Sequence, residues 1–145
     1  MAHTLAWYGQ AFKTIFNKEV DIPDDSFKVA LTNTGYTPDL DADDYFNDVT
    51  NELSGGGYTS GGHALVSPTW VQNGGSNLWT LDANDLVISA LSVTNMKYGV
   101  IYDSTPGSAA TNPLIALITF DAAQTFTNAT MTLQWNASGI VTITY

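Results

Sequence analysis

The sequence has 145 residues, of which 14 are aspartate or glutamate and only 4 are lysine or arginine, giving a formal net charge of -10 at pH 7. This length fits one domain, and the surplus of acids excludes a nucleic-acid-binding protein, which needs basic side chains to neutralise phosphates. The lack of cysteine excludes disulfides, thiolate metal sites and cysteine nucleophiles, and no apolar run approaches the roughly 20 residues of a membrane-spanning helix.

The N-terminal segment carries apolar residues at helical spacing. These residues are Leu5, Tyr8, Phe12 and Ile15. Their recurrence predicts an amphipathic helix over residues 5–17. Thr4 suits the N-cap position, because its hydroxyl can accept a hydrogen bond from a free amide of the first turn. Lys13 interrupts the apolar run, so we expect no secretory signal here.

A period of two residues begins at Phe27. Phe27, Val29 and Leu31 alternate with polar or small residues, which predicts a half-buried strand within residues 27–36. Residues 37–52 form an acidic insert in which we expect one short helical turn. The glycine-rich stretch that follows is predicted to be a loop, and it lacks the lysine that a phosphate-binding Walker motif requires.

The second half of the sequence is punctuated by Asn, Asp, Gly and Pro, as is typical of short strands joined by turns. The predicted strands are 63–71, 78–81, 86–93, 97–102 and 114–120, followed by a hairpin over 130–145 that turns at 136–139. The segment 114–120 is apolar on both faces, which indicates a central strand. The elements together predict a mainly β protein: a single-domain antiparallel β-sandwich or partly open barrel over residues 1–145, with one N-terminal amphipathic helix and a β-rich body over 27–36 and 63–145.

Few side chains suit catalysis. His3 and His63 are the only histidines, and the serine of Gly57–Gly61 stands one position too late for a nucleophile elbow. A glycosidase needs two carboxyl groups about 5 to 10 Å apart across one cleft, and nothing in the sequence places a second acid opposite the acidic insert. We therefore expect no enzymatic activity, no catalytic residue and no cofactor.

The acidic insert matches part of a calcium-binding loop. Asp39, Asp41 and Asp43 occupy the alternate positions with which an EF-hand loop begins. Asp44 stands where that loop needs glycine, and Thr50 stands where it needs a bidentate glutamate. Helix capping and solvation explain the acids more simply. We therefore predict no metal site and keep calcium at Asp39, Asp41 and Asp43 as the alternative.

Two segments are candidates for contact with another protein. The C-terminal strand lacks the lysine, proline or charge that usually protects an exposed sheet edge. Its candidate contact residues are Thr142, Thr144 and Tyr145, and the alternative is that this strand is internal in its own sheet. The predicted helix carries aromatic side chains that can bind a partner or, by default, pack on the protein's own core. These residues are Trp7, Tyr8, Phe12 and Phe16.

A set of motifs occurs in an order that resembles one protein family. The motifs are Phe27–Asn33, Tyr36–Asp39, Tyr45–Val49, Glu52–Gly55, Gly57–Gly62, Gly99–Asp103, Pro113–Ala116 and Gln134–Ile140. This ordered set, which covers about residues 5–145, resembles a family of small structural proteins of tailed-bacteriophage virions. The sequence departs from the family pattern at Leu53, where valine is common, and at Ser67–Trp70.

The resemblance implies a virion component and supplies no catalytic residue. Because an acidic chain without arginine is poorly suited to the DNA-lined interior of a head, we expect a capsid decoration or cement protein on the outer surface of the head. It would assemble in the host cytoplasm and bind the major capsid protein and copies of itself, with neither nucleic acid nor membrane as a partner.

The alternative is a tail or fibre protein that binds a host surface glycan. Trp70 or Trp79 offers the aromatic platform that such binding uses. Trp135 alternates with Leu133 and Met131, which is the pattern of a core residue instead.

Overall fold

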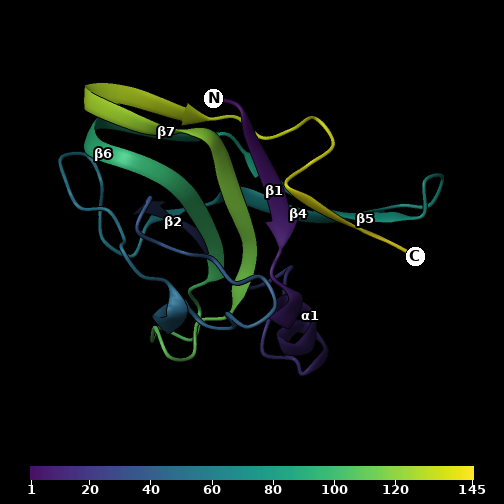
Figure 1. Cartoon of the computed structure of the whole chain (residues 1–145). Helices are drawn as coiled ribbons and strands as arrows, with labels where there is room; N and C mark the ends of the chain where they lie inside the picture. Colours follow the sequence, from purple (N-terminus) through teal and green to yellow (C-terminus); the bar gives the residue numbers. More distant parts are fainter.

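The computed structural model describes all residues 1–145 and shows a mainly β protein with two antiparallel sheets and one short N-terminal helix (Figure 1). The five-stranded sheet has the order β1 (His3–Trp7), β7 (Leu114–Leu133), β6 (Leu86–Asp103), β2 (Phe27–Asn33) and β3 (His63–Ala64). The three-stranded sheet has the order β4 (Val66–Asn73), β5 (Leu78–Asn84) and β8 (Val141–Thr144). The predicted β-sandwich with a single α-helix, α1 (Gly9–Phe16), is confirmed.

Two long strands, β6 and β7, form the centre of the larger sheet and curve over the molecule (Figure 1). They are 18 and 20 residues long, so the separate strands predicted at 86–93 and 97–102 are one strand. The predicted turn between them is a bulge: the pairing with β7 shifts register there, and Asn95 takes a positive φ of 55°. Bulges bend the strands that carry them, so β6 and β7 curve around the larger core and do not form a flat pair.

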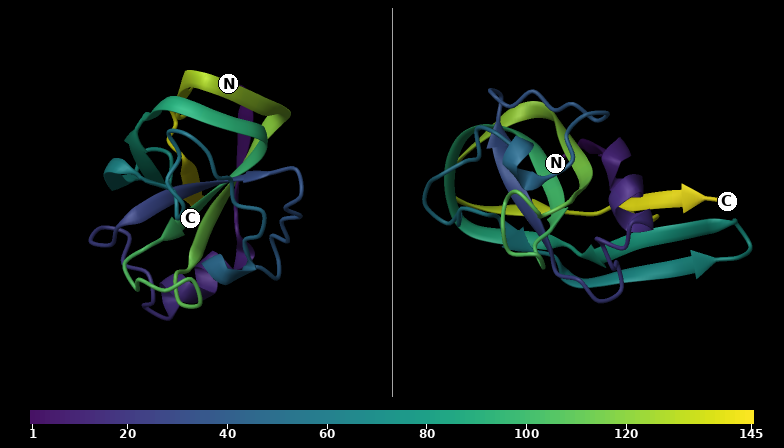
Figure 2. Two further views of the ribbon diagram at one scale, coloured as in Figure 1. Left: turned by 90° about the vertical axis from the view of Figure 1, so that its left-hand side faces the viewer. Right: turned by 90° about the horizontal axis from the view of Figure 1, so that it is seen from below.

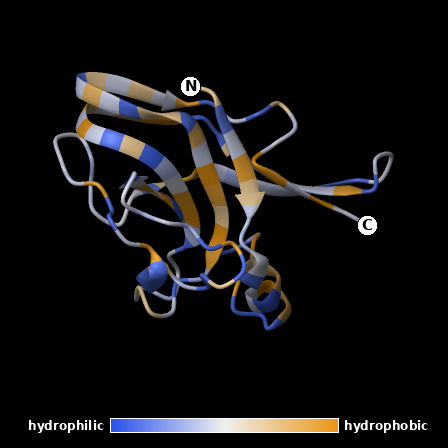
Figure 3. Cartoon of the chain, viewed as in Figure 1, coloured by the Kyte–Doolittle hydropathy of each residue, from blue (hydrophilic) through white to orange (hydrophobic).

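Two hydrophobic clusters lie on opposite faces of the five-stranded sheet. The larger core has 24 buried residues and fills the space between the sheets, and the smaller core has 8 and lies against α1 and the acidic insert. β7 supplies Ile118 to the larger core and Leu117 to the smaller one, so 114–120 is apolar on both faces, as predicted. β2 likewise buries Val29 on one face and Ala30 on the other, so the prediction of a half-buried strand is wrong. Figure 3 shows apolar residues along β1 and the adjoining part of β7.

The predicted helix over residues 5–17 is wrong at its N-terminal end. His3–Trp7 is the strand β1, which pairs antiparallel with β7, and α1 begins only at Gly9. Thr4 therefore lies within a strand, and Tyr8 takes the N-cap position without a side-chain cap bond. The physical reason is the edge of β7, which offers this segment a ladder of hydrogen bonds that the local spacing of apolar residues does not reveal.

The predicted C-terminal hairpin is also wrong, although its turn forms. A bridge joins Asn136 and Gly139, but the strand after the turn, β8, does not pair with β7. It crosses to the other sheet and pairs with β5, where Val141 lies opposite Leu81. The reason is not a lack of space on β7, because β1 pairs only with its residues 116–120. The edge of β5 instead offers β8 a ladder that also buries Val141 in the larger core.

The acidic insert contains the one helical turn that was predicted, the 3-10 helix η1 (Phe46–Asp48). Asp48 Oδ2 accepts a hydrogen bond from the backbone N–H of Asp44 over 3.0 Å. Phe46 stacks on Tyr102 with ring centroids 4.1 Å apart. The insert is thus capped by its own acid and anchored to the smaller core by an aromatic ring.

β4, β5 and β8 form an arm that projects from the body of the molecule (Figure 2). Almost every residue of β4 is exposed, whereas Leu81 and Val141 at the base of the arm belong to the larger core. Trp70 and Trp79 stack on the arm with ring centroids 5.5 Å apart. The arm is thus attached through its base and through Trp70, which is the one residue of β4 that is partly buried and which packs against the larger core.

Candidate functional site

The two histidines and the glycine-rich loop do not form a catalytic group. The ring of His3 packs edge-on against Phe120. The hydroxyl of Ser60 donates to Glu52 over 3.2 Å and not to a histidine. Nε2 of His63 is buried without a hydrogen-bond partner, and burial lowers the pKa of this imidazole. No histidine is therefore placed to activate a nucleophile.

The acidic insert is held together by carboxylates that accept hydrogen bonds. Asp39 Oδ1 accepts from the N–H groups of Asp41 and Ala42, both over 3.0 Å. Asp43 Oδ2 accepts from the N–H of Asp39 over 3.0 Å and from the hydroxyl of Tyr36 over 2.8 Å. No group of three or more His, Cys, Asp or Glu side chains is placed to hold a metal ion. Asp39, Asp41 and Asp43 are therefore not gathered as calcium ligands, and the carboxylates of Asp39 and Asp43 stabilise turns instead.

The four aromatic residues predicted to bind a partner do not share one surface. Tyr8 is wholly buried, and its hydroxyl hydrogen-bonds that of Tyr36 over 3.0 Å. The prediction for Tyr8 is therefore wrong, because its place in the smaller core leaves no surface for a partner. Phe12 packs against Trp7 with ring centroids 5.1 Å apart. Phe16, at the end of α1, is 82% exposed and is the one member of the set that is largely open to solvent.

The edge strands of the two sheets differ in how they are protected. β3 is 2 residues long, and β4 carries Pro68 and a register shift, features that hinder the pairing of a further strand. β1 and β8 contain no proline, lysine, arginine or acid, and both pair in regular register. The unprotected edges are therefore β1 and β8. Of the predicted edge contacts, Thr142 and Thr144 lie on β8 and Tyr145 follows it.

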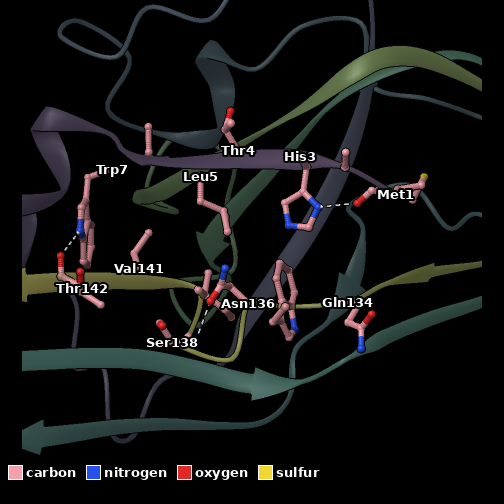
Figure 4. A pocket seen from close by; sticks show the side chains of 15 residues that line it. Met1, His3, Thr4, Leu5, Trp7, Gln134, Asn136, Ser138, Val141 and Thr142 are labelled. Atoms are coloured by element: carbon pink, nitrogen blue, oxygen red, sulfur yellow. Dashed lines mark hydrogen bonds between the residues drawn. The ribbon is translucent and has the colours of Figure 1, made fainter.

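The two unprotected edges border an open groove of about 740 Å³. β1 forms one wall, and the segment 134–142 forms the other. Figure 4 shows the side chains of His3, Leu5 and Trp7 pointing from β1 toward that segment, whereas Thr4 points away. None of the 15 lining residues is Asp, Glu, Lys or Arg. The groove walls are thus free of acidic and strongly basic side chains, in a chain whose net charge is -10.

The side chain of Trp7 spans the groove at one end. Its indole Nε1 donates to the backbone carbonyl of Thr142 over 3.0 Å. Because an indole side chain lies between the two backbones, β1 and β8 are further apart here than the about 4.8 Å of paired strands. Trp7 therefore holds the two walls apart and closes this end of the groove.

The groove side of β1 presents backbone groups that do not pair with β7. The carbonyl of Ala2 and the N–H of Tyr8 bond to β7, over 3.2 and 3.1 Å. Backbone groups of an antiparallel strand alternate between its two sides. The N–H and C=O groups of His3, Leu5 and Trp7 therefore face the open edge.

Glu52 ties the glycine-rich loop to the body of the protein. Its Oε1 accepts hydrogen bonds from the hydroxyl of Tyr58 and the N–H of Gly61, both over 2.6 Å. The hydroxyl of Tyr102 donates to the carbonyl of Gly61 over 2.5 Å. Burial, followed by the bond to Glu52, raises the pKa of Tyr58, so its hydroxyl stays a donor. This network is structural, because every strong acceptor in it is already engaged.

A buried carboxyl group lies at the end of β6, away from the groove. Asp103 is wholly buried. Its Oδ1 accepts the N–H of Thr105 over 2.8 Å, and its Oδ2 is buried without a hydrogen-bond partner. Burial, with a further contribution from the neighbouring Asp25 carboxylate, raises the pKa of Asp103 to about 6. This group therefore gains a proton in mildly acidic solution.

The sequence did not identify the groove. The predicted helix over residues 5–17 contains Leu5 and Trp7, and the predicted hairpin over 130–145 contains the opposite wall, so neither prediction brings the two walls together. The available signal was the spacing of His3, Leu5 and Trp7 by two residues, which predicts a strand as readily as the helical pattern predicts a helix.

The chain matches no family model, no curated protein and no solved structure. None of its helices has the length and apolar character needed to cross a membrane. Its function must therefore be inferred from its own sequence and geometry.

Proposed function

We propose that the chain is a non-enzymatic structural protein of a tailed-bacteriophage virion, and that it decorates the outer surface of the head as a cement protein. The observation that carries this proposal is the pair of unprotected edges, β1 and β8, which border one groove. An exposed sheet edge can pair with a strand of another protein. Unprotected edges are therefore expected in a protein whose role is to bind other proteins. The ordered motifs that resemble phage structural proteins support the same role.

The charge of the chain supports the outer face of the head. The 14 acidic residues outnumber the 4 basic ones, so packaged DNA would repel this protein. The outside of a coat-protein shell imposes no such penalty. There the chain would contact the major capsid protein and neighbouring copies of itself, with neither nucleic acid nor membrane as a partner.

A cement protein acts through repetition. Each copy adds a modest interface at a junction between coat subunits, and many such interfaces together shift the assembly equilibrium toward the closed shell. The expected location is the outer surface of the head, after synthesis and assembly in the host cytoplasm.

Counting copies per particle tests the proposal. Quantitative gel or mass-spectrometric analysis of purified virions should give a number of copies comparable with that of the coat protein. Virions from which the chain has been removed should lose DNA at a lower temperature than intact ones. Virions that hold few copies, or stripped heads of unchanged heat resistance, would contradict the cement role.

The second candidate is a glycan-binding tail or fibre protein. It is favoured by one observation, the partly exposed stack of Trp70 and Trp79 on the arm. This role requires few copies per particle and saturable binding of host surface polysaccharide, weakened by Trp79→Ala. Trp135→Phe is an unsuitable control, because Trp135 is buried and its indole donates to Asn84 over 3.0 Å. The exposed Phe16→Ala is the suitable one.

A further inference from the structure

We propose that the groove between β1 and β8 receives an extended segment of a partner protein, which pairs with β1 as an added strand. This inference rests on the proposed function and deepens it, because it names the contact through which the chain would hold a coat subunit. Strand addition to a free sheet edge is a general mode of peptide recognition, in which backbone bonds give affinity and side-chain pockets give specificity.

The contrast among the edges is the first argument. The two sheets have four edges, β1, β3, β4 and β8. β3 is too short to template a strand, and β4 is interrupted by Pro68 and a register shift. The two edges without such protection are the two that border the groove. Proteins block edges that must stay unpaired, so this distribution indicates that the groove edges are kept for pairing.

The backbone of β1 supplies the second argument. The N–H and C=O groups of His3, Leu5 and Trp7 point away from β7, by alternation from the bonds of Ala2 and Tyr8. An added strand would satisfy these groups in the same antiparallel or parallel pattern as any sheet neighbour. Trp7 limits the site at one end, because its indole is bonded across to Thr142. The added strand, in either orientation, would therefore occupy the edge of β1 between the closed end at Trp7 and His3.

The walls define the side chains that the added strand should carry. Leu5, Ile140 and Val141 line the groove, and Leu5 is only partly buried against the larger core. Residues of the added strand that face inward would cover these apolar groups, and residues that face outward would meet water. The segment is therefore one in which apolar and polar residues alternate, with no charge on the inward face.

The surroundings of the groove define the charge at the ends of the segment. The N–H of Asp121 bonds to Ala2 over 3.2 Å, and the carboxylate of Asp85 accepts the N–H of Trp135 over 2.9 Å. Lys97 Nζ donates to the backbone carbonyl of Asp121 over 3.2 Å. Two exposed acids and one lysine thus lie beside residues that line the groove, and their net charge is negative. A segment flanked by lysine or arginine fits this setting, whereas a second copy of a chain with net charge -10 does not.

A designed peptide provides the probe. It has alternating valine and threonine with lysines at both ends, and a matched peptide has glutamates at the ends instead. Amide hydrogen exchange of the whole chain is followed by NMR. The lysine peptide should slow the exchange of the N–H groups of His3, Leu5 and Trp7 by at least about tenfold, and the glutamate peptide should do so less. Edge amides that exchange at the same rate with and without the lysine peptide would overturn the proposal.

Two variants locate the effect. Leu5→Lys places a charge on the groove side of β1 and should abolish the protection, whereas Thr4→Lys places the same charge on the opposite side and should preserve it. Because Leu5→Lys can weaken folding, His3→Pro is the second test: it removes an edge N–H that β7 does not use. Equal peptide binding by the wild-type chain, Leu5→Lys and His3→Pro would contradict the assigned groove.

The remaining outcomes identify the occupant and separate this inference from the proposed function. If the edge amides become protected as the chain alone is concentrated, and sedimentation shows a dimer, the occupant is a second copy and the partner assignment is wrong. The peptide experiment contains no virion, so its failure leaves the cement role to be judged by copy number. Conversely, absence of the chain from virion heads would refute the cement role while peptide protection still supported strand addition.

Discussion

The indole N–H of Trp7 and the backbone carbonyl of Thr142 are 135 residues apart in the sequence and 3.0 Å apart in the structure. This bond joins the edge strand of one sheet to the edge strand of the other, although the two strands share no ladder of backbone bonds. The two sheets of the sandwich are therefore connected at this side by a side chain instead of by a strand.

Trp7→Phe removes the indole donor and keeps an aromatic ring beside Phe12. We expect the free energy of unfolding to fall by about 1 kcal/mol, the net contribution of one hydrogen bond. Urea denaturation measures the change. The matched control is Trp79→Phe, which can retain the stack on Trp70 and leaves the bond to Thr142 intact. A Trp7→Phe chain as stable as the wild type would show that this bond contributes nothing.

Asp103→Asn should change how stability depends on pH. The pKa of Asp103 in the folded chain is about 6, above its ordinary value of 3.8. Between these values the folded chain binds a proton that the unfolded chain has lost, so this group makes the free energy of unfolding fall as the pH rises through that window.

Asparagine carries no charge at any pH, so Asp103→Asn removes the fall in the free energy of unfolding that ionisation of Asp103 causes. At pH 7 we expect the free energy of unfolding of the variant to exceed that of the wild type by about 2–3 kcal/mol, and its melting temperature to be higher. Below about pH 4 we expect this difference to disappear. Thermal unfolding at both pH values provides the measurement. A loss of stability at pH 7 that is absent below pH 4 would contradict this expectation and show that the ionised carboxylate is needed in the fold.

Glu52→Gln tests the anchor of the glycine-rich loop. The carboxylate accepts two hydrogen bonds of 2.6 Å, and bonds to a charged acceptor contribute about 1.5–3 kcal/mol each. We expect the free energy of unfolding of the variant, measured by urea denaturation, to fall by about 1.5–3 kcal/mol. We also expect protease to cleave the variant faster between residues 54 and 62. Ser60→Ala is the control, because its longer bond of 3.2 Å is exposed. Comparable losses in both variants would contradict the role of Glu52.

Gly62→Ala and Gly107→Ala form a matched pair. Both glycines have a positive φ, of 80° and 83°, but a Cβ at Gly62 would collide with the backbone of Val29, whereas a Cβ at Gly107 would meet nothing within 4 Å. Both variants incur the backbone strain of about 1 kcal/mol, and only Gly62→Ala adds the collision. We expect a clearly larger fall in melting temperature for Gly62→Ala. Equal melting temperatures would show that the loop moves aside without cost.

The elements that the sequence predicted correctly are those whose pattern is local. Phe27–Asn33 and the apolar segment 114–120 became strands, because alternation or apolar content marks a strand wherever its neighbours lie. Trp135 became a core residue, with 6% of its surface exposed, because it shares a face with Met131 and Leu133.

The elements that the sequence did not predict are those decided by distant partners. Leu5 fits both a helical and an alternating pattern, and the edge of β7, more than a hundred residues later, selects the strand. The turn at 136–139 is local, but the position of β8 depends on β5 having a free edge. The groove arises from both of these choices, so no local pattern could reveal it.

The pairing of β1 with β7 has a consequence for biosynthesis. His3 and its partner Phe120 are more than a hundred residues apart in the sequence, so His3 leaves the ribosome long before Phe120. Contacts between such distant segments form late and slowly, so the larger sheet cannot be completed before the segment of β7 around Phe120 has been synthesised. The nascent chain therefore has to remain soluble with β1 unpaired. Most of its acids lie between Glu19 and Glu52, ahead of β7 in the chain, and their charge repels neighbouring nascent chains.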